Sequence, residues 1–231
     1  MLFNGYEFIF IFLPITFFFY FYLNSKRQIA ASKALLVFSS LFFYSWWNIL
    51  YLPIILASML FNYVIGNMLG SGGKTLKRFS RSRLLTFGIV SNLSLLAYFK
   101  YMDFFINNLN YFKSIDINTF NLALPLAISF FTFQQIAYLV DSYKRETQEY
   151  DFLNYSLFVT FFPQLIAGPI VHHKEMMPQF VQLKTKVINY KNISLGLFIF
   201  SIGLFKKTVI ADTFAVWATV GFDISESLNM I

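Results

Sequence analysis

Long apolar runs constrain the fold of this chain more than any other feature. They lie near residues 6–23, 34–50, 52–69, 84–102, 122–140, 152–171 and 193–222. A helix needs about 20 predominantly apolar residues to cross a bilayer, and several runs approach that length. Hydrophobic residues make up 57% of the chain and charged residues only 13%, which excludes an ordinary soluble domain. The sequence therefore predicts an all-α, polytopic transmembrane helical bundle, with residues 1–231 forming a single membrane domain in the lipid bilayer.

The residue types exclude several kinds of site. The chain has no cysteine, so disulfides, thiolate metal ligands and cysteine nucleophiles are absent. The two histidines, His172 and His173, are neighbours and alone make a poor metal centre. The stretch GSGGKT (70–75) imitates a phosphate loop, but Met68 stands where that pattern requires glycine, and a membrane helix precedes it. No metal site and no bound cofactor is predicted.

The basic residues predict the orientation of the chain. The net charge is +7, but the charges lie in short loops between apolar runs, so no nucleic-acid partner is expected. Loops 24–33 and 70–83 contain lysine and arginine without acids, which places them in the cytoplasm. The connection 103–121 has balanced charge and is expected outside. The N-terminus is then outside as well, and the run at 6–23 is a retained span, because it lacks a basic n-region and a cleavage site.

The run at 152–171 is broken by proline and glycine. Pro163 lies in its middle, followed by Gln164 and the pair Gly168-Pro169. A full crossing would place four following lysines, between residues 174 and 191, outside the cell, against the positive-inside rule. A re-entrant helical element that turns at Pro163, Gly168 and Pro169 keeps them inside; an ordinary proline-kinked helix is the alternative. Irregular backbone at membrane depth usually borders a cavity.

Polar side chains within the apolar runs are candidates to line such a cavity. Ser129, Gln134 and Gln135 lie in the run 122–140, where a polar group in hydrocarbon is costly unless it faces the bundle interior. Gln164 is a further candidate, although it could instead satisfy the broken backbone. Interhelical hydrogen bonding is the alternative role for the other three.

Several stretches resemble the membrane-bound O-acyltransferase family. The stretches are LPLAISFFTFQQIAYLVDSYK (124–144), FFPQLIAGPIVHHKEMMPQF (161–180) and IGLFKKTVIAD (202–212), with LFNGYEFIFIFLP and SLFFYSWWNILYL nearer the N-terminus. They follow the family order along essentially the whole chain. The closest likeness is to the branch that O-acetylates alginate and peptidoglycan.

The resemblance implies an activity, a location and partners. It implies transfer of an acyl group, usually acetyl, from a cytoplasmic donor such as acetyl-coenzyme A to a cell-envelope polysaccharide or a partner protein. The location implied is the bacterial inner membrane, and the partner would be a periplasmic or extracellular acetyltransferase or the polysaccharide itself.

The resemblance also implies where the catalytic base lies. In the family this base is a membrane-embedded histidine far downstream, in a region that would follow Ile231. The chain therefore resembles the N-terminal half of the enzyme, has no expected catalytic residue and is expected to be inactive alone. His172 and His173 are expected at the cytoplasmic interface.

Lys206 and Lys207 split the last apolar run into 193–205 and 208–222. They are expected either to snorkel to the cytoplasmic face, which makes 193–205 a half-span, or to line an aqueous pocket. Together with His172 they are candidates to attract the phosphates of the donor. Interfacial anchoring is the alternative role of the two lysines.

Two other classes of protein stay open. Transporters and flippases also build sites from helices broken by glycine and proline, although no inverted repeat is visible here. A non-catalytic membrane scaffold that recruits a periplasmic partner is the third hypothesis.

Overall fold

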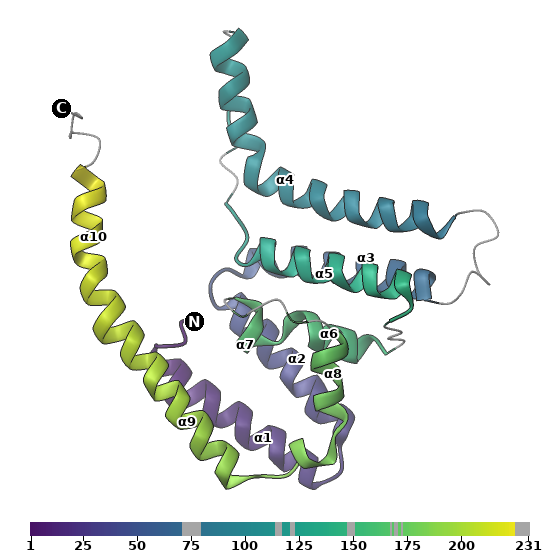
Figure 1. Ribbon diagram of the computed structural model, residues 1–231, viewed down its shortest axis with the longest axis vertical. Coiled ribbons are helices and arrows are strands. Elements are labelled where there is room, and N and C mark those ends of the chain that lie inside the picture. Colours follow the sequence, from purple (N-terminus) through teal and green to yellow (C-terminus); the bar gives the residue numbers. More distant parts are fainter. Residues whose placement is uncertain are drawn as a thin grey trace. The chain divides into compact units, whose positions relative to one another are not determined.

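Apolar helices make up most of the computed structural model (Figure 1). It describes residues 1–70, 80–113, 117–120, 123–146, 151–166, 168, 171 and 173–224. All regular secondary structure in these residues is helical. Four helical runs in the described part are long and apolar enough to cross a membrane, namely Phe8–Ser25, Ile49–Gly70, Arg81–Phe112 and Tyr190–Phe222. The prediction of an all-α polytopic membrane protein is confirmed.

The chain divides into two compact units. The smaller contains Met1–Phe17 and Val187–Ile231, and the larger contains Phe18–Lys186. A π-helical segment, η1 (Phe8–Phe12), leads into α1 (Leu13–Ser25). The expected single membrane domain over residues 1–231 stays a prediction.

The larger unit consists mainly of helices of unequal length. They are α2 (Ile29–Ser45), η2 (Ile49–Tyr51), α3 (Leu52–Gly70), α4 (Arg81–Lys113), α5 (Ile128–Lys144), α6 (Phe152–Thr160), α7 (Phe162–Leu165), α8 (His173–Val181) and η3 (Leu183–Thr185). The apolar runs 34–50 and 52–69 form separate helices, because the chain leaves α2 after Ser45 and Asn48 caps η2 by accepting a hydrogen bond from the Leu50 N–H at 2.9 Å.

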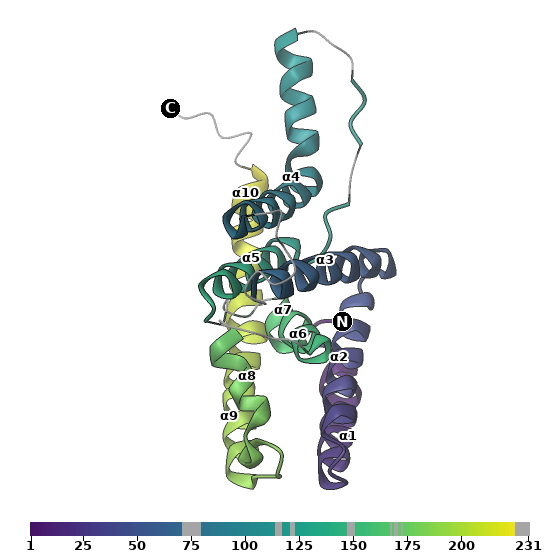
Figure 2. The ribbon, with the colours of Figure 1, turned by 90° about the vertical axis from the view of Figure 1, so that its right-hand side faces the viewer.

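Three of these helices form the core of the larger unit. α3, α5 and the first part of α4 pack side by side, and α2 runs at an angle to them and packs against α6 and α7 (Figures 1 and 2). Small residues permit the close approach. A Cβ atom on Gly66 of α3 would lie 2.7 Å from the hydroxyl oxygen of Tyr138, and one on Gly88 of α4 would lie 2.7 Å from a methyl carbon of Leu139. Both partners belong to α5 and are buried.

α4 is much longer than the apolar run at 84–102. It has 33 residues and ends at Lys113, so the expectation that residue 103 begins a connecting loop is wrong. Apolar residues continue at helical spacing beyond residue 102 and extend the helix. Both views show α4 bending, with its second part standing clear of the other described helices of the larger unit (Figures 1 and 2).

The broken run forms two short helices, α6 and α7. Between them Phe161 leaves the helical conformation, with φ −48° and ψ 108°. Pro163 lies in the first turn of α7, where its missing N–H is not needed. The N–H of Phe162, at the start of α7, donates to Oγ of Ser40 in α2 at 3.1 Å. The protein interior thus satisfies the broken backbone, as irregular structure at membrane depth requires.

Gly168 closes the turn after α7. Its N–H donates to the Gln164 carbonyl at 3.0 Å, and a Cβ atom at this position would lie 2.6 Å from the Gln164 Cα. Only glycine fits such a close approach of two backbone segments. Pro169 lies outside the described residues.

In the smaller unit, α9 (Tyr190–Phe205), η4 (Lys206–Ala211) and α10 (Asp212–Ile224) form one uninterrupted helical run. Lys206 and Lys207 split the apolar run without interrupting the helix. Their position relative to a membrane stays a prediction. The helix widens there into the π-helical segment η4, so the two lysines are accommodated within a continuous helix.

Candidate functional site

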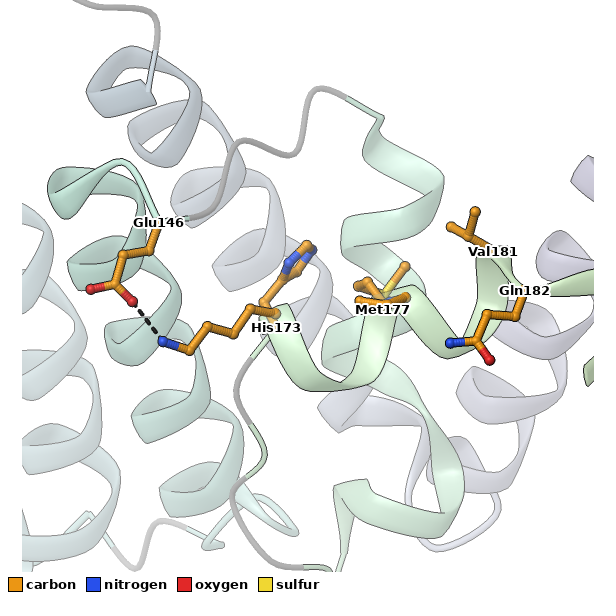
Figure 3. Close-up of a pocket in the computed structure, with 7 residues that line it drawn as sticks. Glu146, His173, Met177, Val181 and Gln182 are labelled. Carbon is orange, nitrogen blue, oxygen red and sulfur yellow. Dashed lines mark hydrogen bonds and ion pairs between the residues drawn. The ribbon is translucent and has the colours of Figure 1, made fainter.

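The two flanks of the broken run lie against each other. Lys174, in the first turn of α8, forms an ion pair with Glu146 at 2.7 Å, and Glu146 lies two residues after the end of α5 (Figure 3). The hydrogen bond to Glu146 and the negative charge of that carboxylate raise the pKa of Lys174. A helix that crossed a bilayer would separate its two flanks by about 30 Å. The juxtaposition is the geometry expected of a re-entrant element, whose position in a membrane stays a prediction.

Basic residues from both predicted cytoplasmic loops lie near the same helix ends. Lys33, at the end of loop 24–33, donates to Oδ1 of Asn154 in the first turn of α6 at 2.6 Å. Arg81, at the end of loop 70–83, donates to the carbonyl of Tyr143 in the last turn of α5 at 2.5 Å and lies over the ring of that residue. The groups that the sequence assigns to the cytoplasm thus contact the flanks of the broken run. Their sidedness stays a prediction.

A pocket of about 590 Å³ opens along α8 (Figure 3). Its lining residues are Glu146, His173, Lys174, Met177, Pro178, Val181 and Gln182. The volume lies within the range of small-molecule sites, which typically combine apolar walls with a few polar groups. The Glu146–Lys174 ion pair supplies charge at one end, and Gln182 lies at the other end of α8.

His173 separates this pocket from the core. It is only 7% exposed, and its ring meets Phe158 edge-on at 5.0 Å and lies 6.1 Å from the ring of Tyr138. α8 turns this first side chain towards α5 and α6. The expectation that His173 lies at the cytoplasmic interface of the membrane stays a prediction. His172 lies outside the described residues.

A second polar feature joins α3, α4 and α5. Oε1 of Gln135 accepts hydrogen bonds from Ser58 Oγ at 2.6 Å and from Asn62 Nδ2 at 2.5 Å. Asn62 and Asn92 exchange side-chain hydrogen bonds of 3.0 and 2.7 Å. All four side chains are buried, and Nε2 of Gln135 has no hydrogen-bond partner among the residues that the structure describes. We call these four residues the amide cluster.

The amide cluster lies beside a groove of about 460 Å³ between α3 and α4. Ser58 and Asn92 contribute to its lining, together with apolar residues that include Phe61 and Phe99. An unpaired buried amide N–H costs about 1–3 kcal/mol. Gln135 itself does not line the groove. Sequence reasoning missed Ser58, Asn62 and Asn92, although asparagines inside the runs 52–69 and 84–102 were a usable signal.

The structure does not bring the predicted cavity-lining residues together. Gln135 belongs to the amide cluster, whereas its neighbour Gln134 points to α6, where Nε2 donates to the Phe158 carbonyl at 2.8 Å. Ser129 and Gln164 are partly buried, and neither lines the two pockets described above. Adjacent residues on a helix point about 100° apart, which explains why the two glutamines diverge.

The remaining candidates for donor phosphates belong to the smaller unit. Lys206 and Lys207 are exposed, and Lys207 forms an ion pair with Asp212. That carboxylate offsets part of the positive charge that would attract a phosphate. Among the described residues, no group of three or more histidine, aspartate or glutamate side chains could hold a metal ion.

The helices, the broken run and the buried polar groups define a polytopic membrane protein with an internal polar site. The chain belongs to the membrane-bound O-acyltransferase family, whose family model matches residues 8–231. No solved structure matched in the comparison.

Three curated relatives show the branch of the family to which this chain is similar. It is 47% identical to a peptidoglycan O-acetyltransferase of Helicobacter pylori, over 100% of this chain and 48% of the relative. It is 34% identical to a probable alginate O-acetylase AlgI of Pseudomonas aeruginosa, over 94% of this chain and 41% of the relative. It is 36% identical to a probable alginate O-acetylase AlgI of Pseudomonas putida, over 94% of this chain and 44% of the relative. The chain thus spans about half the length of these relatives.

Proposed function

We propose that the chain is the N-terminal part of an integral membrane O-acetyltransferase of the bacterial cell envelope. The observation that carries the proposal is the similarity to a peptidoglycan O-acetyltransferase along the whole chain. Membership of the membrane-bound O-acyltransferase family supports acyl transfer as the reaction class. The acceptor is a hydroxyl group of peptidoglycan or of another envelope polysaccharide, reached directly or through a periplasmic partner protein.

The donor in this proposal is acetyl-coenzyme A, which approaches from the cytoplasm. The pocket along α8 supports this choice, because cations from both predicted cytoplasmic loops contact the helix ends beside it. Lys174 is the cation in the pocket itself, and an anionic donor would compete with Glu146 for it. Apolar walls that include Met177 and Val181 suit the uncharged part of the donor.

The reaction breaks the thioester bond and forms an oxygen ester. The acceptor hydroxyl oxygen attacks the acetyl carbonyl carbon, a general base takes the hydroxyl proton, and the coenzyme A thiolate leaves and takes up a proton. We propose that the base is a histidine outside residues 1–231. The packing of the His173 ring against Phe158 supports a structural role for that histidine.

The test compares O-acetylation of the envelope polysaccharide with and without the gene. Deletion should lower the ester-linked acetate released by mild alkali, and a plasmid copy of the complete gene should restore it. Unchanged acetate in the deletion strain would refute the proposed function.

The direction of transfer has its own test. Labelled acetyl-coenzyme A added to inside-out membrane vesicles should transfer label to polysaccharide. The same donor added to right-side-out vesicles should not, because the donor then faces the wrong side. Equal labelling in both preparations would contradict a cytoplasmic donor site.

A further inference from the structure

The second part of α4 carries an exposed apolar stripe. Tyr101, Phe104, Phe105, Leu109 and Phe112 recur at the spacing of three and four residues that places them on one helix face. Their side chains are between 42% and 79% exposed. Both views show this part of α4 clear of the other described helices of the larger unit (Figures 1 and 2). We call residues 101–113 the α4 arm.

The opposite face of the α4 arm carries Asp103 and Asn110 beside the buried Ile106, and it is held by the chain itself. Oδ1 of Asp103 accepts a hydrogen bond from the Phe120 N–H at 2.9 Å. Asn110, two helical turns further on, donates to the Ile117 carbonyl at 2.8 Å and accepts from the Ile117 N–H at 3.0 Å. These bonds fix the rotation of the arm about its own axis. The apolar stripe therefore points away from the returning chain.

One asparagine lies within the apolar stripe. Asn108 sits between Phe104 and Leu109 on the helix surface, and its Nδ2 donates to the Phe104 carbonyl at 2.7 Å. The bond satisfies part of the amide within the helix. Such a residue is compatible with a shallow, headgroup-level position and unfavourable in the hydrocarbon core.

The length of α4 places the arm at the end of a membrane crossing. A helix of 33 residues is about 50 Å long, whereas the hydrocarbon core of a bilayer is about 30 Å thick. The part of α4 before the arm packs on α5 and has about the 20 residues that one crossing needs. The arm thus begins where the crossing ends, and the bend in α4 turns it out of the line of the first part (Figures 1 and 2).

We infer that the α4 arm is an interfacial helix whose partner is the phospholipid surface. Its apolar stripe inserts to the level of the headgroup and acyl-chain boundary, and its polar face, with Asp103 and Asn110, stays in water. Partial insertion of large apolar side chains from one helix face is how amphipathic helices bind a bilayer surface. Tyr101 suits this depth, because tyrosine is enriched at membrane interfaces. The inference is independent of the proposed acyl transfer.

Depth-dependent fluorescence quenching tests the inference in the protein reconstituted in phosphatidylcholine vesicles. The chain lacks cysteine, so Phe105→Cys and Phe112→Cys each carry a single environment-sensitive fluorophore on the apolar stripe. Asn107→Cys is the matched control, because it is exposed on the same arm about 200° around the helix from residue 105. Using two stripe positions keeps the test decisive if one variant does not fold.

Nitroxide-labelled lipids with a shallow label should quench the fluorophores at 105 and 112 about threefold more than the one at 107. Aqueous iodide should show the reverse order. Strong iodide quenching and weak lipid quenching at both stripe positions would overturn the inference, because the stripe would then face water. Weak quenching by both agents at these positions would also overturn it, because the stripe would then be covered by protein.

Discussion

At the scale of single residues, the amide cluster shows how buried polar groups hold three helices together. Asn62 is its centre, because it bonds both Gln135 of α5 and Asn92 of α4. Removing one member of such a cluster leaves its buried partners unsatisfied, which costs more than the lost hydrogen bond itself.

We therefore expect Asn62→Leu to lower the stability of the detergent-solubilised protein by about 1–3 kcal/mol. Asn107→Leu is the matched control. It replaces the same residue type at an exposed position and leaves the amide cluster intact. The measurement is the midpoint of thermal unfolding, followed by loss of the monodisperse peak in size-exclusion chromatography. Equal midpoints for the two variants would show that the amide cluster does not stabilise the fold.

Glycine supplies a second prediction at this scale. Gly66→Ala should destabilise the protein, because the added methyl group would overlap the ring of Tyr138, which is buried. Gly196→Ala has no atom within 4 Å of the added carbon and should be neutral or stabilising, since alanine favours a helix over glycine by about 1 kcal/mol. Thermal unfolding of both variants distinguishes the two effects. A Gly66→Ala variant as stable as Gly196→Ala would contradict the close packing of α3 on α5.

The buried glutamines and asparagines show what the sequence could and could not predict about the site. The polarity of Gln134 and Gln135 correctly indicated buried positions, because a polar group in hydrocarbon is too costly to leave exposed to lipid. Their partners depend on helix rotation and register, which composition does not determine. Asn62 and Asn92 were therefore missed as members of the cluster.

At the scale of helices, the sequence predicted which segments are apolar helices better than where they end. The long apolar runs correctly predict α2, α3 and the start of α4, because the length and hydropathy of a segment can be read from its own residues. The predicted far end of α4 was wrong, because the helix continues to Lys113. Asp103 looked like a loop signal, but the helix continues past it, and its carboxylate accepts a hydrogen bond from the Phe120 N–H at 2.9 Å.

The broken run gives a prediction at the same scale. In the cysteine-free chain, Glu146→Cys and Lys174→Cys together should be joined efficiently by a short bis-maleimide, because the native side chains meet at 2.7 Å. Glu146→Cys with Gln182→Cys is the control, since Gln182 lies at the other end of α8 (Figure 3). Products are separated after cleavage of the chain between the two positions. Equal yields from both pairs would contradict the juxtaposition of the flanks.

Membrane sidedness needs a separate experiment. Lys184→Cys should resist an impermeant maleimide in intact cells and react in inside-out vesicles, because a re-entrant element returns the chain to the cytoplasm. Ile117→Cys, on the predicted external connection after α4, should show the opposite pattern. Labelling of Lys184→Cys from outside intact cells would instead favour a kinked helix that crosses the bilayer.

At the scale of the whole molecule, donor binding and turnover should separate. The described residues of this chain form the pocket along α8, whereas the proposed catalytic histidine lies outside residues 1–231. The family relatives are about twice as long as this chain. Donor binding and the catalytic base can therefore belong to different halves of the protein.

We therefore expect residues 1–231, reconstituted alone, to bind acetyl-coenzyme A without transferring acetyl groups. Acetyl-coenzyme A should slow maleimide modification of Gln182→Cys several-fold, because this position lines the pocket and leaves the Glu146–Lys174 ion pair intact. Modification of Asn107→Cys should not change, and free acetate should protect neither position. Protection without turnover would support a donor site built by this half of the molecule. Equal rates at Gln182→Cys with and without donor would place the donor elsewhere, even if the gene proves necessary for polysaccharide acetylation.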